Sequence, residues 1–74
     1  MRDIAKVAYE SLAVGSVGFM QPDAKKGETL EDFQTVVDTA DEMESEGLIL
    51  ILDKHRESYS GNRFIVMIQF RRLV

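Results

Sequence analysis

The chain has 74 residues, a formal net charge of −4 and no cysteine. A domain of this size buries only about 60% of the surface of its unfolded chain, so we expect one domain over residues 1–74 without an enclosed active site. The absence of cysteine excludes disulfides, thiolate zinc sites and a cysteine nucleophile. The apolar fraction of 45% is typical of a globular protein.

Acidic and basic residues are segregated along the chain. Residues 28–53 contain nine acidic residues and no basic residue, which gives this stretch a charge of −9. Residues 54–74 carry five basic residues against one acidic residue (+4), and residues 1–27 carry four against three (+1). The net charge therefore hides an acidic middle followed by a basic end.

The first segment predicts a helix from Arg2 to about Ala13. Apolar residues recur there at helical spacing, and charged residues share the opposite stripe. Gly15 and Gly18 then interrupt the pattern. The stretch from Val14 to Met20 predicts either a short strand or an irregular crossing.

A second, short helix is predicted between Pro22 and Gly27. Proline is suited to the first turn of a helix, and glycine commonly follows the last one.

The next helix has the clearest pattern in the chain. Thr29 predicts its N-cap, with Asp32 three residues later, and Gly47 predicts the left-handed residue that ends it. The apolar residues between them share one helical arc. Glu44 is the exception, because it falls on the apolar arc and opposes the helix dipole near the C-terminal end.

Beyond Gly47 the apolar period changes from helical to strand-like. Leu48–Leu52 and Arg63–Arg72 predict an antiparallel hairpin with a long loop, His55–Asn62, between its arms. Four residues of the second arm should face the helices, namely Phe64, Val66, Ile68 and Phe70.

The other face of the hairpin remains apolar and needs a cover. We expect a third strand, a terminal segment or a second subunit to supply it. The residues predicted to form this partner interface are Ile49, Ile51, Ile65 and Met67, together with Tyr59 in the loop. Tyr59 has a second interpretation, in which it folds back on the hairpin.

The order of elements resembles that of winged-helix domains. The stretch Met43–Ile49 looks like the junction between their recognition helix and first wing strand, with Glu44, Glu46, Gly47 and Leu48 in the corresponding places. The resemblance implies an α+β fold of two to three helices followed by an antiparallel hairpin, with Lys54–Arg63 as the wing.

The resemblance also implies DNA binding, but the charges oppose its usual mode. The exposed face of the long helix is expected to carry Glu31, Gln34, Thr35, Asp38, Asp41 and Glu42. Carboxylates in the major groove would oppose binding, which depends largely on neutralising phosphates. Contact with duplex DNA would then rely on basic residues elsewhere, namely Lys54, Arg56, Arg63, Lys25 and Lys26, with Arg71 and Arg72.

Catalysis and metal binding have little support in the sequence. His55 lies near Asp53, Ser58 and Ser60, but all four share one predicted loop region with no pocket to hold them. Two metal-ligand candidates two residues apart are not a site, and the acidic cluster of the long helix is interpreted as a solvated face.

The sequence therefore predicts a non-enzymatic interaction or regulatory module without a cofactor. We expect a homodimer or a protein partner, no small-molecule substrate and no membrane contact, because no long apolar stretch is present. With no export signal, a cytoplasmic location is expected. The alternative is a small DNA-binding regulator that contacts the DNA backbone through the wing.

Overall fold

The computed structural model describes residues 3–58, 61 and 64–74. Two α-helices, one short 3-10 helix and three strands follow one another along the described chain. In chain order they are α1 (Ile4–Glu10), β1 (Val17–Met20), η1 (Ala24–Lys26), α2 (Leu30–Ser45), β2 (Ile49–Arg56) and β3 (Ile65–Arg72).

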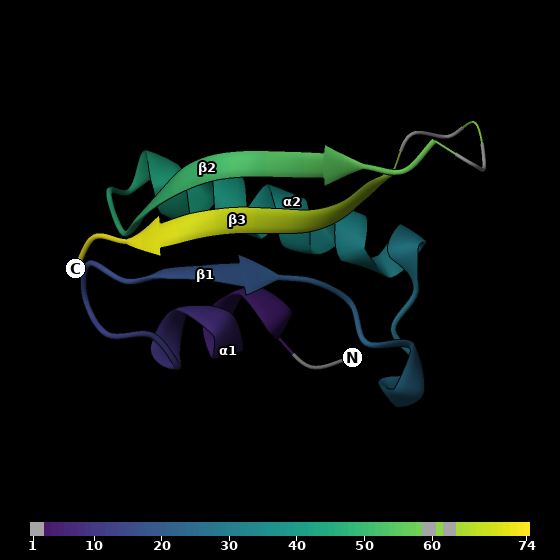
Figure 1. The fold of residues 1–74 in the computed structure, drawn as a ribbon, viewed down its shortest axis with the longest axis horizontal. Coiled ribbons are helices and arrows are strands. Elements are labelled where there is room, and N and C mark those ends of the chain that lie inside the picture. Colours follow the sequence, from purple (N-terminus) through teal and green to yellow (C-terminus); the bar gives the residue numbers. More distant parts are fainter. Residues whose placement is uncertain (1–2, 59–60, 62–63) are drawn as a thin grey trace.

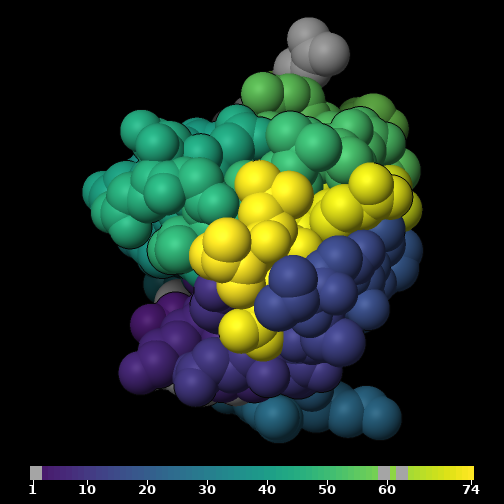
Figure 2. Space-filling model, turned by 90° about the vertical axis from the view of Figure 1, so that its left-hand side faces the viewer, coloured from purple at the N-terminus to yellow at the C-terminus, as the bar shows by residue number. Residues whose placement is uncertain are grey.

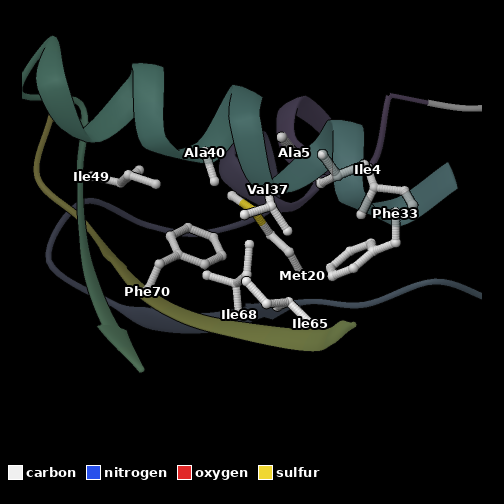
Figure 3. Packing of buried hydrophobic residues seen from close by; sticks show 11 residues of the cluster. Ile4, Ala5, Met20, Phe33, Val37, Ala40, Ile49, Ile65, Ile68 and Phe70 are labelled. Atoms are coloured by element: carbon white, nitrogen blue, oxygen red, sulfur yellow. The ribbon is translucent and has the colours of Figure 1, made fainter. Parts of the chain in front are cut away.

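The three strands form one antiparallel sheet in the order β1-β3-β2. α1 packs on β1, α2 packs on β2 and β3, and both helices cover the same face of the sheet (Figure 1, Figure 3). The α+β class is thus confirmed. β3 lies in the centre, so β1 and β2 are the two edge strands.

α1 is shorter than the predicted helix. The side chain of Asp3 accepts a hydrogen bond from the backbone N–H of Lys6 at 3.1 Å and caps the first turn. The helix ends at Glu10, three residues before the predicted end, with Ser11 as its C-cap.

The segment between α1 and α2 contains a strand, which decides between the two predicted conformations. β1 pairs with β3 from Val17 opposite Arg71 to Met20 opposite Ile68. The short helix that follows is confirmed as a 3-10 turn, but Asp23 is its N-cap. Pro22 therefore precedes the helix instead of occupying its first turn.

Both predicted ends of α2 are confirmed. The hydroxyl of Thr29 accepts a hydrogen bond from the N–H of Asp32 at 3.1 Å. At the other end Gly47 has φ = 79°, and the N–H of Leu48 donates to the carbonyl oxygen of Met43 at 3.0 Å. The N–H of Gly47 also donates to the carbonyl oxygen of Glu44, and the two hydrogen bonds form a Schellman motif. This motif ends the helix and leads the chain directly into β2.

A register shift changes which residues of β3 face the helices. Ile65 pairs with Arg56 and Met67 pairs with His55, so Val66 is an extra residue between them. Ile68 is buried on the helix side as predicted, but the shift brings Ile65 to that side as well. Strict alternation, which placed Ile65 on the opposite face, was wrong because of this bulge.

The face predicted for the start of β2 was also wrong. Ile51 pairs with Phe70, a buried core residue, and paired residues of antiparallel strands share a face. Ile49 is 1% exposed and Ile51 packs against the core. The apolar residues left outside are Leu50 and Leu52.

The core lies between the sheet and the two helices (Figure 3). Among the described residues, eleven buried apolar ones belong to it: Ile4, Ala5, Met20, Phe33, Val36, Val37, Ala40, Ile49, Ile65, Ile68 and Phe70. Burial of each valine, isoleucine, phenylalanine or methionine side chain among them contributes about 1.5–3 kcal/mol.

Glu44, the exception on the apolar arc of α2, contacts the edge of β2. The N–H of Leu73 donates to the carbonyl oxygen of Leu48, which makes these two residues a hydrogen-bonded pair. Such pairs alternate along antiparallel strands, so the N–H of Ile51 points away from β3. Oε2 of Glu44 accepts a hydrogen bond from that N–H at 2.7 Å. We call this the capped edge of the sheet.

Candidate interaction surfaces

The outer face of the sheet, opposite the helices, carries most of the exposed large apolar side chains of the strands. Phe19 is 51% exposed, Leu50 44%, Leu52 42% and Val17 39%. Phe19 and Val17 lie on β1, whereas Leu50 and Leu52 lie on β2. The outer face therefore has an apolar group on each edge strand.

Polar residues of β3 separate the two apolar groups of the outer face. Arg71 lies between Val17 and Leu50, and Gln69 lies between Phe19 and Asp53. Arg71 is exposed and makes no ion pair with a described residue. The outer face thus offers apolar contact area with one central positive charge.

The predicted partner interface is only partly accessible. Ile49 and Ile65 are buried at 1% and 5% exposure, and Ile51 also faces the core, so none of them can form a surface. Met67 pairs with the exposed His55 and lies half-buried on the outer face. Tyr59 lies outside the described residues.

The acidic face of α2 is narrower than predicted. Glu31, Asp38 and Glu42 are exposed. Gln34 instead faces β3. Its Oε1 accepts a hydrogen bond from the N–H of Ile65 at 3.2 Å, and its Nε2 donates one to the carbonyl oxygen of Ile65 at 3.0 Å. Asp41 forms an ion pair with Lys54.

The basic residues proposed for DNA do not form one patch. Nζ of Lys54 lies 2.8 Å from Oδ1 of Asp41, and its side chain is 32% exposed. Arg56 is exposed at the end of β2, whereas Lys25 and Lys26 lie on η1, beyond the opposite edge of the sheet (Figure 1). Arg63 lies outside the described residues.

Arg72 has a structural role that the sequence did not reveal. Its guanidinium donates hydrogen bonds to the carbonyl oxygens of Leu12 at 2.7 Å and Tyr9 at 3.2 Å, and it lies 4.3 Å from the centre of the Tyr9 ring. Its expected contact with phosphates is therefore replaced by contacts that join β3 to the end of α1. A basic residue at a strand end carries no sequence signal for such a role.

A groove of about 410 Å³ lies between α1 and the second half of α2. Tyr9, Met43 and Leu48 are the apolar residues of its lining, which also includes Asp3, Lys6, Glu10, Thr39 and Arg72. Figure 2 views this end of the molecule, where the C-terminal residues (yellow) lie between the end of α2 (teal) and α1 (purple). No local sequence pattern predicts this groove, because its walls come from four separate segments.

His55 and Asp53 form an exposed pair, with 3.0 Å between Nε2 and Oδ2. Their side chains are 50% and 56% exposed, and no described hydroxyl group is hydrogen-bonded to His55. Among the residues that the structure describes, no group of three or more potential metal ligands occurs. Ser60, the other hydroxyl considered with His55, lies outside them.

Comparisons with known proteins leave the family of the chain open. The chain matches no protein-family model, no curated protein and no solved structure. Within the described part of the chain, neither α-helix has the length and apolar character that a membrane crossing requires.

Proposed function

We propose that this protein is a non-catalytic, winged-helix-like interaction module that associates with itself. The observation that carries the proposal is the outer face of the sheet, where Val17, Phe19, Leu50 and Leu52 are each exposed by more than a third. Four large apolar side chains exposed on one face of a protein of 74 residues favour a contact with another protein over permanent exposure to water.

The order of elements supports the winged-helix-like part of the proposal. A helix, a strand, a short helix, a long helix and a hairpin follow one another, and the first strand pairs with the last. In this interpretation α2 corresponds to the recognition helix, and the loop between β2 and β3 corresponds to the wing.

The acidic surface of α2 supports a protein partner rather than DNA. Glu31, Asp38 and Glu42 would face the phosphates if α2 entered the major groove, and Lys54 is already paired with Asp41. Lys25 and Lys26, which are exposed together on η1, keep duplex DNA as the alternative, because a basic edge can bind DNA in an acidic protein.

Sedimentation velocity over a range of concentrations tests self-association. Four side chains on a small sheet cover less than the roughly 800 Å² per partner of a standard interface, so we expect a weak, reversible dimer. The double variant Phe19→Asp, Leu50→Asp should stay monomeric with an unchanged circular dichroism spectrum. A wild-type protein that is monomeric at all concentrations would contradict self-association.

Duplex binding at two salt concentrations tests the alternative. If DNA is the partner, the variant Lys25→Ala, Lys26→Ala should lower the slope of log affinity against log salt by about 1–2. No binding at low salt would exclude the DNA interpretation and leave the interaction module.

A further inference from the structure

The free edge of β1 presents backbone groups that form no hydrogen bond with the residues that the structure describes. The N–H of Arg72 donates to the carbonyl oxygen of Ser16, so these residues form a hydrogen-bonded pair between β1 and β3. Because such pairs alternate, the backbone groups of Val17 and Phe19 point away from β3. No described residue outside the sheet makes a hydrogen bond with them. We call these N–H and carbonyl groups the open edge.

Exposed apolar side chains lie around the open edge both on the outer face of the sheet and on α1 in the helix layer. Val17 and Phe19 lie on the outer face, and β1 contains no charged residue and no register shift. In the helix layer Val7 of α1 is 47% exposed. Tyr9 lines the groove between α1 and α2. Val7 is separated from Tyr9 by about 160° around the helix, so it lies on the side of α1 that faces away from this groove. A strand placed beside β1 would contact these groups.

α1 lies in the helix layer, on one side of the plane in which such a strand would pair (Figure 1, Figure 3). Figure 1 shows α1 beside the free edge of β1 and not beneath the middle of the sheet, and Figure 3 places it on the helix side. A fourth strand at the usual spacing of about 4.8 Å would extend the outer face and cover α1. α1 then packs beneath a complete four-stranded layer.

Two lysines lie at one end of the open edge, beside Asp23 and Glu28, whose carboxylates accept hydrogen bonds from backbone N–H groups of their own turn. η1 begins four residues after β1 ends, and both views place it beyond the open edge (Figure 1, Figure 2). Lys25 and Lys26 are exposed there and form no ion pair with a described residue. An antiparallel strand would begin beside η1, so acidic residues at its N-terminal end would lie near both lysines.

We propose that the open edge of β1 binds an extended segment of a partner protein, apolar at alternate positions and acidic at its N-terminal end. Main-chain hydrogen bonds to Val17 and Phe19 supply affinity in such strand addition, and the flanking side chains supply specificity. This site uses backbone groups at one edge, so it stands independently of self-association through the outer face.

Backbone amide exchange by NMR tests the proposal with the wild-type chain. The probe is the synthetic peptide acetyl-Glu-Glu-Val-Thr-Val-Thr-Val-Thr-amide. The N–H groups of Val17 and Phe19 should exchange about tenfold more slowly when the peptide is at ten times its dissociation constant. Gly18 and Met20, whose backbone groups already face β3, should change little. A peptide that begins with Lys-Lys should bind at least about tenfold more weakly.

Two variants separate this site from the others. Val17→Pro removes an N–H that bonds to nothing within the described fold, so it should abolish peptide protection of Phe19 without unfolding the sheet. Val17→Thr keeps the N–H and serves as its matched control. Leu50→Asp weakens the outer face at the opposite edge, and the peptide should still bind this variant.

The outcomes distinguish the two proposals. If neither amide of the open edge gains protection, or if protection appears on β2 instead, strand addition at β1 is wrong whatever the oligomeric state. Equal binding of the acidic and basic peptides overturns the charge preference. A monomeric protein whose Val17 and Phe19 amides become protected supports this site and contradicts self-association.

Discussion

The two edges of the sheet differ in length, charge, regularity of register and the hydrogen bonding of their outward backbone groups. β1 has four uncharged residues, a regular register and outward backbone groups that bond to no described residue outside the sheet. β2 has eight residues, two register shifts and a polar second half, Asp53–Arg56, and Glu44 occupies the N–H of Ile51. The features that prevent pairing with another sheet are therefore concentrated on β2. β2 is the longer edge strand, so it could form the larger number of backbone hydrogen bonds with a second sheet.

The need to block the β2 edge accounts for an acidic residue at an unfavourable place on α2. Glu44 opposes the helix dipole and interrupts the apolar arc, yet its carboxylate reaches β2, one of the two edges that head-to-tail pairing of copies would need. If β2 of one copy paired with β1 of the next, the contact would not close and a fibre would grow. The capped edge removes one partner of that contact.

Gly18→Val should have the largest effect, because it attacks the attachment of β1 itself. A Cβ at position 18 would lie 2.6 Å from Cδ1 of Leu12, on the side where α1 packs. We expect a loss of about 2–3 kcal/mol in the free energy of unfolding, measured by urea denaturation. Leu12→Ala should recover part of that loss in the double variant, and additive effects would contradict this contact.

Gln34→Ala should have the next largest effect, because it loosens the start of β3. The variant leaves the N–H and the carbonyl oxygen of Ile65 without their side-chain partner, at an expected cost of about 1.5–2 kcal/mol. Gln34→Glu keeps an acceptor and loses the donor, so it should lie between wild type and Gln34→Ala. Faster exchange of the Ile65 amide is the direct readout, and unchanged exchange would contradict the assignment.

Glu44→Ala tests the capped edge against a matched control, Glu46→Ala. Both changes relieve an acidic charge near the C-terminal end of α2, but only Glu44 bonds to Ile51. We therefore expect Glu46→Ala to be more stable than Glu44→Ala by about 1 kcal/mol. Only Glu44→Ala should expose the Ile51 amide to exchange and increase association at high concentration. Equal behaviour of the two variants would remove the distinction between the edges.

The sequence predicted those features that short segments determine. The N-cap at Thr29 and the turn at Gly47 depend on residues within one helical turn, and both are confirmed. The side of the sheet on which Ile65 lies depends instead on its pairing with Arg56. This pairing joins residues nine positions apart in the sequence. Alternation alone contains no signal for a bulge, so Ile65 was assigned to the wrong face.

The candidate surfaces were harder to predict because they depend on backbone direction. The open edge is defined by the direction of two N–H groups, which follows from the register of β1 with β3 and from no residue type. Gln34 and Lys54 looked like surface residues, yet each is occupied by a contact with a distant element. A polar residue type is therefore a weak indicator that a side chain is available to bind a partner.

The smallest expected effect concerns the ion pair beside the capped edge. Lys54 and Asp41 join β2 to α2, but their side chains are 32% and 49% exposed, so solvent weakens the attraction. A double-mutant cycle with Lys54→Met and Asp41→Asn should give a coupling of about 0.2–1 kcal/mol that falls as salt is added. Asp38→Asn, an exposed change on the same helix, should show no coupling to Lys54. A coupling that salt leaves unchanged would mean that the pair is shielded from solvent, and that α2 covers more of the β2 edge than Glu44 alone.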